Sequence, residues 1–160
     1  MNYSEHSIPT SENSGCVLVV DDNDQVRQML ALALETAGFD VIEAGTQFEA
    51  QDQLSHTRPD ALVLDLQRSA ADGLDVLSSI RARHDLRAVP ILFLAGCEND
   101  EFRWQALRAG ADWFGLRPLG MIELQKRVAA LIRNGRPLLK AIAGRNRRRL
   151  STRRRLRPAG

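Results

Sequence analysis

Cysteine, histidine and long apolar runs are all scarce in this sequence of 160 residues. No apolar run is long enough to cross a bilayer, and residues 1–15 lack the apolar core of a signal peptide. We therefore predict a cytoplasmic protein without a membrane span. The three histidines are scattered along the chain, so they do not suggest a zinc site.

The two cysteines are too few for a disulfide framework. Cys16 begins the first predicted strand, whereas Cys97 follows the carboxyl end of a later one. Strands of about five residues would hold these two ends roughly 17 Å apart, which is beyond the reach of a disulfide. We therefore expect no bridge between them.

Acidic side chains are absent from residues 133–160, although this stretch holds eleven of the 22 Lys and Arg residues. The other eleven basic residues and all 20 acidic residues lie within residues 1–132. This part therefore carries a formal charge of −9, while the whole chain carries +2. We predict a disordered N-terminal tail over residues 1–15, one folded domain over residues 16–133, and a basic, disordered tail over residues 134–160.

Apolar residues alternate along the chain between the spacing of buried strands and that of amphipathic helices. Each of five short apolar runs precedes a helical pattern, which indicates a parallel sheet with helices on both faces. We predict an α/β fold, a doubly wound five-stranded parallel sheet of order 2-1-3-4-5 with five helices, as in flavodoxin-like proteins. The predicted strands lie near residues 17–20, 39–44, 60–66, 89–96 and 112–116, and the helices near residues 26–37, 47–55, 74–83, 101–109 and 121–133.

Carboxylates follow the first and third predicted strands. Asp21 and Asp22 come after the run VLVV, and Asp65 follows LVL. These strands are neighbours in the predicted sheet, and ligands bind outside such carboxyl ends, so three carboxylates should converge there. They suit Mg²⁺, and a metal-screened carboxylate can attack a phosphoryl group. Asp65 is the candidate nucleophile and Asp22 a metal ligand, with Asp21 beside it. One of Asp22, Asn23 and Asp24 could instead cap the following helix.

The segments VLVVDD, LVLDL, DGLDVL, AGAD and RP occur in this order, and together they resemble the receiver domain of two-component response regulators over residues 16–132. The resemblance implies that Asp65 is the phosphoacceptor, with Asp21 and Asp22 as the acidic pair. It also implies Mg²⁺ as the cofactor, held by these three residues and the main-chain carbonyl of Gln67. The family takes its phosphoryl group from a sensor histidine kinase or a histidine phosphotransfer protein, and then rearranges a surface that a downstream protein reads.

Two positions depart from the family pattern. Ala95 stands where the family has Ser or Thr, so a hydroxyl that would bind a phosphoryl oxygen is missing. Arg117 replaces the family lysine and keeps the charge, but its planar fork is bulkier than an ammonium group. We therefore expect weakened coupling to Phe114, the aromatic switch position, and to Trp104, a candidate partner anchor. The resemblance further implies a cis bond between Arg117 and Pro118.

Three functions are compatible with these features. The first is a single-domain, response-regulator-like receiver in a phosphorelay, with no enzymatic activity beyond its own phosphorylation and dephosphorylation. The second is an interaction module that works independently of phosphate, which would fit the changes at Ala95 and Arg117, although a normally phosphorylated domain could also carry them. The third is weak, non-specific binding of nucleic acid through the basic tail, unless that tail is simply disordered beside the acidic domain.

Overall fold

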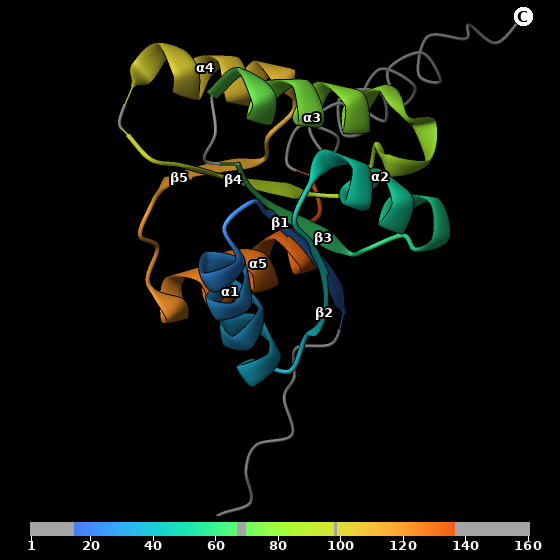
Figure 1. Cartoon of the computed structure of the whole chain (residues 1–160), viewed down its shortest axis with the longest axis vertical. Helices are drawn as coiled ribbons and strands as arrows, with labels where there is room; N and C mark the ends of the chain where they lie inside the picture. The colour runs from blue at the N-terminus through green and yellow to red at the C-terminus, as the bar shows by residue number, and fades with distance from the viewer. Residues whose placement is uncertain (1–14, 67–69, 98, 137–160) are drawn as a thin grey trace, which may run out of the picture.

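The structure of the chain is a computed structural model that describes residues 15–66, 70–97 and 99–136 (Figure 1). Residues 1–14 and 137–160, which make up most of the two predicted tails, lie outside these ranges. No helix within the ranges has both the length and the apolar character of a membrane span. The elements are β1 (Cys16–Asp21), α1 (Asp24–Thr36), β2 (Asp40–Ala44), α2 (Gln47–His56), β3 (Ala61–Asp65), α3 (Ala70–Ala82), a 3₁₀ helix η1 (His84–Leu86), β4 (Ile91–Ala95), α4 (Asp100–Ala109), β5 (Trp113–Leu116) and α5 (Met121–Asn134).

The helix α3 begins at Ala70, four residues before the predicted start at residue 74. Its first residues are small or acidic, so they carry no apolar helical spacing. Gly73 is buried in this turn, and it lies so close to β4 that a Cβ would meet the ring of Phe93 at 2.8 Å. Packing against the sheet therefore extends this helix beyond its sequence signal.

The five strands form one parallel sheet in the predicted order, β2-β1-β3-β4-β5. The strand β1 lies between β2 and β3, and the register with β3 places Asp21 beside Asp65. Because the strands are parallel, all their carboxyl ends lie at one edge of the sheet. Cys16 starts β1 and Cys97 follows the end of β4, and both thiols are free.

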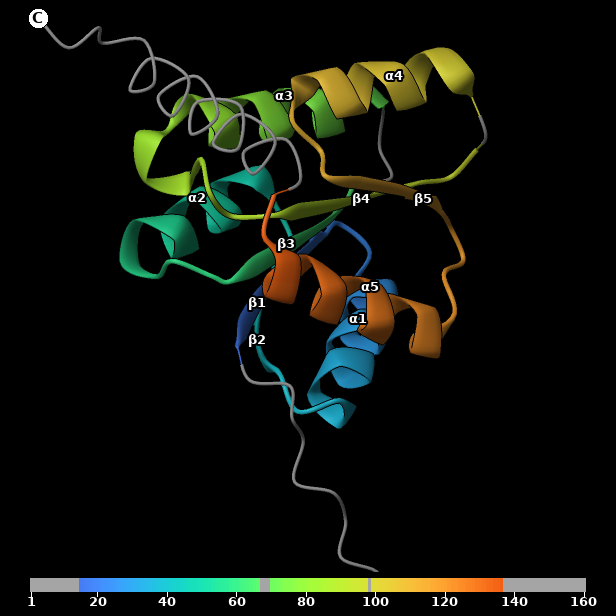
Figure 2. The same cartoon turned by 180° about the vertical axis from the view of Figure 1, so that it is seen from behind.

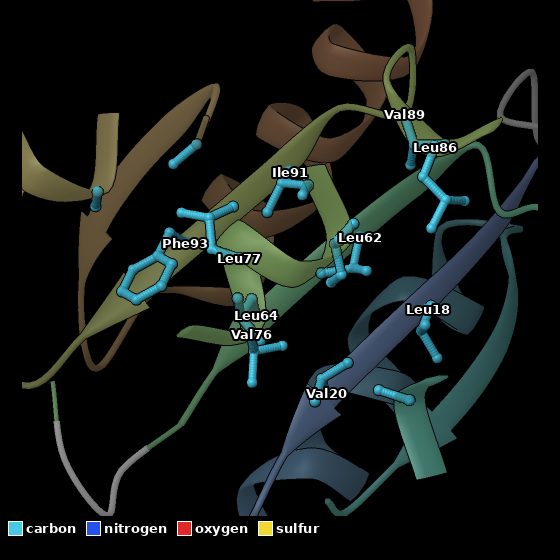
Figure 3. Packing of buried hydrophobic residues seen from close by; sticks show 14 of the residues in the cluster. Leu18, Val20, Leu62, Leu64, Val76, Leu77, Leu86, Val89, Ile91 and Phe93 are labelled. Carbon is cyan, nitrogen blue, oxygen red and sulfur yellow. The ribbon is translucent and has the colours of Figure 1, made fainter. Parts of the chain in front are cut away.

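Helices cover both faces of the sheet. The helices α1 and α5 lie on one face, and α2, α3 and α4 lie on the other, as Figures 1 and 2 show from opposite sides. Successive strand side chains point to opposite faces, so Leu18 and Val20 pack with α2 and α3 (Figure 3) while Val17 and Val19 pack with α1 and α5. Burial on both faces explains why the strands are continuous apolar runs in the sequence.

Side-chain caps fix where three helices begin. The Oδ1 of Asn23 accepts a hydrogen bond from the Val26 N–H at 3.0 Å and caps α1. Thr46 and Asn99 cap α2 and α4 in the same way. The cap of α1 is therefore the amide of Asn23, which confirms that one of Asp22, Asn23 and Asp24 caps this helix.

A buried charge network lies at the opposite, amino-terminal edge of β4 and β5. Asp112 has a side chain that is 3% exposed, and its two oxygens pair with Arg81 and Arg136, each at 2.9 Å. The Arg81 guanidinium also donates to the main-chain oxygen of Val89 at 2.7 Å, and that of Arg136 donates to the main-chain oxygen of Arg87 at 2.9 Å. The network ties the residues after α5 to the start of β4.

Candidate functional site

The carboxyl edge of the sheet brings two of the predicted site residues together. Asp21 is the last residue of β1 and Asp65 is the last residue of β3, and they are direct partners in the parallel register. Both are fully buried, with 0% of their surface exposed. Acidic side chains are almost never fully buried unless they are paired, so this juxtaposition marks a site and not ordinary core.

Three oxygens of this pair are buried without a hydrogen bond. Asp21 Oδ1 accepts from the Asn23 N–H at 2.8 Å, but Asp21 Oδ2 and both oxygens of Asp65 have no donor. Arg117 Nε lies 2.9 Å from Asp65 Oδ1, in an ion pair without the geometry of a hydrogen bond. A buried polar group left without a partner costs about 1–3 kcal/mol. These oxygens can therefore bind a cation or accept hydrogen bonds from a molecule outside the chain.

Burial and repulsion change the acidity of both carboxyl groups. Burial raises the pKa of Asp65, the charge of Asp21 raises it further, and the opposing effect of Arg117 leaves it at about 7. Burial also raises the pKa of Asp21, and the hydrogen bond from Asn23 offsets part of this effect. Two neighbouring buried acids resist being ionised together. A cation bound between them would lower both pKa values, because it favours their charged forms.

The third acid, Asp22, is partly buried and lines a different pocket from Asp65. Its pocket has a volume of about 170 Å³ and is also lined by two aspartates of α3. Within the described residues, no group of three or more His, Cys, Asp or Glu side chains is arranged to hold a metal ion. The structure thus brings Asp21 and Asp65 together but does not place all three acids in one ready ligand set. Gln67, the other predicted ligand, lies outside the described residues.

Arg117 follows β5 and reaches across the edge of the sheet to Asp65. Its main-chain N–H donates to the carbonyl of Ala95 at 2.8 Å, which fixes it beside the end of β4. Its bond to Pro118 is cis, which confirms what the resemblance implies. Arg117 and Asp65 also line a pocket of about 420 Å³, whose other walls are mainly apolar residues of α1, α5 and the segment before α5. Apolar surroundings strengthen the interaction between the two charges.

The two predicted switch and interaction residues lie in contrasting environments. Phe114 is 9% exposed and clusters with Phe93 and Phe102, with ring centroids 5.7 to 6.0 Å apart. Trp104 on α4 is 64% exposed. Ala95 ends β4 and is buried. Rings from β4 and α4 therefore hold Phe114 inside the domain, while Trp104 presents an apolar surface to solvent.

Sequence reasoning missed one residue of this site, Gly96. A Cβ on Gly96 would lie 3.1 Å from Nη2 of Arg117 and 3.5 Å from its Cζ. The guanidinium therefore rests against the main chain just after β4, in space that another residue would partly fill. The signal in the sequence is a glycine after Ala95 together with an arginine in place of the family lysine. This signal can be interpreted only in the folded structure, which brings the segment after β4 and the segment after β5 side by side.

Comparisons with known proteins agree with this fold. The profile of the response regulator receiver domain matches residues 17–129. The response regulator MprA of Mycobacterium avium is 39% identical over 121 residues, which cover 76% of this chain and 52% of MprA. The transcriptional regulatory protein PrrA of Mycobacterium leprae is 38% identical over 124 residues, which cover 78% of this chain and 52% of PrrA. The chain thus spans about half the length of the curated relatives it matches.

Solved structures show the same architecture. The receiver domain of the Francisella response regulator 1452 matches with a TM-score of 0.68 and 26% identity, over 75% of this chain and 98% of that domain. The chemotaxis protein CheY4 of Vibrio cholerae matches with a TM-score of 0.68 and 26% identity, over 72% of this chain and 97% of CheY4. The fold and the acidic edge are those of a two-component signalling domain. The chain belongs to the response regulator receiver domain family. Receiver domains generally act in signalling without catalysing reactions of other substrates, and they generally bind Mg²⁺ at the phosphorylation site.

Proposed function

We propose that this receiver accepts a phosphoryl group on Asp65 as a step in a phosphorelay. The observation that carries the proposal is the buried Asp65 carboxylate, whose oxygens have no hydrogen bond and which lies beside Asp21 at the carboxyl edge of the sheet. In the transfer, an Asp65 oxygen forms a bond to phosphorus while the bond from phosphorus to the donor atom breaks. The donor leaves with the electron pair of that bond.

Asp21 and Asp65 would hold the Mg²⁺ that the family generally uses, with Asp22 and the main-chain carbonyl of Gln67 as further ligands. The orphaned carboxylate oxygens of Asp21 and Asp65 fit this role, because Mg²⁺ is bound by oxygen ligands. When bound, the ion supplies positive charge that screens the acids from the phosphoryl oxygens. Asp65 would then be ionised at neutral pH, and Arg117 would remain beside it to balance the negative charge of the product.

The phosphoryl donor would be the histidine of a sensor histidine kinase or of a histidine phosphotransfer protein. The output would be binding of a downstream protein to the rearranged surface. The relatives are named as a response regulator and a transcriptional regulatory protein, which supports a role in signalling. In this role the chemistry is confined to the chain's own aspartate, so we propose no enzymatic activity on other substrates, and we place the protein in the cytoplasm.

The proposal is tested by incubating the full chain with Mg²⁺ and acetyl phosphate and measuring the intact mass. The wild type should gain the mass of one phosphoryl group, and Asp65→Asn should gain none because the nucleophile is absent. Asp21→Asn should lose most of the uptake, because one metal ligand is lost. The matched control is Asp40→Asn, an exposed acid at the start of β2, which should label like the wild type. Continued labelling of Asp65→Asn would refute the assignment.

A second candidate function is an interaction module that does not depend on phosphate. It is favoured by Arg117, which already balances the charge of Asp65, and by Ala95, which has no hydroxyl to offer a phosphoryl group. In that case the wild type would take up no phosphate from acetyl phosphate.

A further inference from the structure

We propose that Arg27 of α1 is a positioning residue for the metal site, and that it fixes the main chain between Asp21 and Asp22 in the orientation that Mg²⁺ binding requires. This inference deepens the proposed function and rests on the Mg²⁺ site described there. Arg27 lies in none of the five short segments that carry the resemblance to receiver domains, so no role has yet been given to it.

The guanidinium of Arg27 contacts the main chain at the point where β1 ends. Its Nη1–H donates to the carbonyl oxygen of Asp21 at 2.9 Å. That oxygen and the N–H of Asp22 belong to one planar peptide group, so the hydrogen bond fixes the peptide that joins the two acids. The paired register of β1 and β2 ends at Val20 and Ala44, one residue before Asp21. Arg27 therefore supplies a donor just beyond the paired part of these strands.

Two acidic partners hold the guanidinium in this place. Its Nη2 lies 2.8 Å from Oδ1 of Asp24, one turn earlier in α1, and its Nε lies 3.3 Å from Oε1 of Glu43 in β2. The side chain of Arg27 is only 16% exposed. Each of the three nitrogens thus meets a different partner, which the planar fork of arginine allows and the compact ammonium of lysine does not. Arg27 therefore connects α1, the end of β1 and β2.

Gly45, directly after β2, leaves the space that the guanidinium occupies. A Cβ on Gly45 would lie 2.8 Å from Nη1 of Arg27, which is too close for a real contact, so the guanidinium would have to move away. Gly45 is not one of the glycines with a positive φ, so its main chain does not itself require glycine. Gly45 and Asp22 line the same pocket of about 170 Å³. Arg27 therefore contacts both strand ends from which residues of this pocket follow.

A positioning role and a purely electrostatic role of Arg27 predict opposite effects on Mg²⁺ binding. A guanidinium has only donors, so Arg27 cannot itself be a ligand of the ion. Its positive charge opposes the binding of a cation, and removal of that charge alone would strengthen binding. Mg²⁺ demands near-ideal octahedral geometry, so removal of a group that orients its ligands should weaken binding.

The first test measures the Kd of Mg²⁺ by isothermal titration calorimetry on the full chain without a phosphoryl donor. Arg27→Met should raise the Kd about tenfold, and Arg27→Lys, which can restore one hydrogen bond, should raise it less. Gly45→Ala should raise the Kd about threefold in the wild-type chain and less than about twofold in the Arg27→Met chain, since Nη1 is absent there. The matched control is Arg108→Met, an exposed arginine of α4, which should bind Mg²⁺ like the wild type. Circular dichroism checks that each variant is folded.

Two results of this test would overturn the inference. Unchanged or tighter Mg²⁺ binding by Arg27→Met would show that the positive charge is the only contribution of this residue. An equal effect of Gly45→Ala in both chains would show that Gly45 does not act through Arg27.

The second test needs neither metal nor phosphate, and it follows the NMR signal of the Asp22 amide. This N–H shares a peptide group with the Asp21 carbonyl, so its signal should shift in Arg27→Met and in Gly45→Ala. The amide of Ala111, which donates to Ala106 at 3.0 Å near the other edge of the sheet, should not shift. An unchanged Asp22 signal in Arg27→Met would overturn the positioning role.

Phosphoryl uptake separates this inference from the proposed function. If Arg27→Met binds Mg²⁺ more weakly than the wild type but the wild type takes up no phosphate, the positioning role stands and the proposed phosphoryl transfer fails. If the wild type takes up phosphate and Arg27→Met keeps its full affinity for Mg²⁺, the proposed function stands and this inference fails.

Discussion

Asp65 occupies a position that is costly for the folded chain. Its carboxyl group is fully buried, has no hydrogen-bond donor and lies beside a second acid, and these features raise its pKa to about 7. An unfolded aspartate has a pKa of 3.8. The folded chain therefore holds a proton that the unfolded chain releases. The contribution of this group to stability is present below pH 3.8 and is lost as the pH rises toward 7.

We predict from this difference that Asp65→Asn stabilises the metal-free protein at pH 8, because the amide stays neutral. The gain should be roughly 1–3 kcal/mol, since each unit of pKa shift corresponds to about 1.4 kcal/mol and neighbouring groups relax. At pH 4.5 the two proteins should differ much less. Urea denaturation in the presence of a chelator at both pH values measures the effect.

Asp40→Asn serves as the control for this prediction, because Asp40 is an exposed aspartate outside the acid pair. It should change stability little at either pH. Addition of Mg²⁺ should stabilise the wild type and not Asp65→Asn, since a ligand that binds only the folded state shifts the equilibrium toward it. A wild type that is more stable than Asp65→Asn at pH 8 without metal would contradict the electrostatic account of the site.

Residues of β4 and α4 determine how far a structural change caused by a phosphoryl group on Asp65 can extend through the domain. Phe114 is packed against Phe93 and Phe102, and Ala95 has no hydroxyl that could draw the segment before α4 toward a phosphoryl group. We predict that beryllofluoride with Mg²⁺ shifts NMR signals around Asp65 far more than those of Phe114 and Trp104. A ligand shifts a conformational equilibrium only by its difference in affinity for the two states, and that difference should be small here.

The test of this coupling is the chain with both Ala95→Thr and Arg117→Lys. It should show larger shifts across α4 and β5, because the hydroxyl then has a phosphoryl mimic to bind. Large shifts at Trp104 in the wild type would show that coupling survives by another route.

The strands β4 and β5 are held at their amino-terminal edge by the network of Arg81, Asp112 and Arg136. Burial and repulsion by Arg136 lower the pKa of Arg81 to about 10, although Asp112 opposes this change. We predict that Asp112→Ala destabilises the protein by about 3–5 kcal/mol, because it leaves two arginine side chains that are only 10% exposed without their shared carboxylate. Urea denaturation measures the loss.

The matched control for this prediction is Glu123→Ala on α5. Glu123 forms an exposed ion pair with Arg127 at 3.6 Å, and exposed pairs contribute less than about 1 kcal/mol. If Asp112→Ala cost no more than Glu123→Ala, the buried network would not be a major source of stability.

For the whole molecule, the acidic residues 1–132 and the basic residues 145–160 determine how strongly we expect the chain to bind nucleic acid. Residues 1–132 carry a formal charge of −9, and residues 145–160 are rich in arginine. We predict that the full chain binds nucleic acid weakly, without sequence preference, and that binding falls steeply between about 50 and 200 mM salt because counterions are released. Deleting residues 145–160 should abolish binding and leave the fold intact, because every described element ends before residue 136.

Fluorescence anisotropy with two unrelated DNA duplexes measures this binding, and circular dichroism of the shortened chain checks the fold. Tight, salt-resistant or sequence-selective binding would contradict a purely electrostatic tail. If the full chain did not bind DNA at low salt, the function would reside in the receiver domain alone.

The sequence by itself was sufficient for the architecture, because the signals for it are local. Buried parallel strands are continuous apolar runs, helices show their spacing and caps, and the alternation of the two leaves few topologies. Asp21 and Asp65 could be assigned to one edge for the same reason, since each ends a strand and the strand order makes them neighbours. The resemblance added what spacing cannot show, including the cis bond before Pro118.

The tertiary structure alone decided the features that depend on distant residues meeting. Examples are the early start of α3 beside Phe93, the contact of Arg117 with Gly96 and the anchoring of Arg136 on Asp112. No local pattern predicts them, because each depends on the space and charge that another segment presents across the folded domain. The raised pKa of Asp65 belongs here as well, since burial and the neighbouring Asp21 exist only once β1 and β3 have paired.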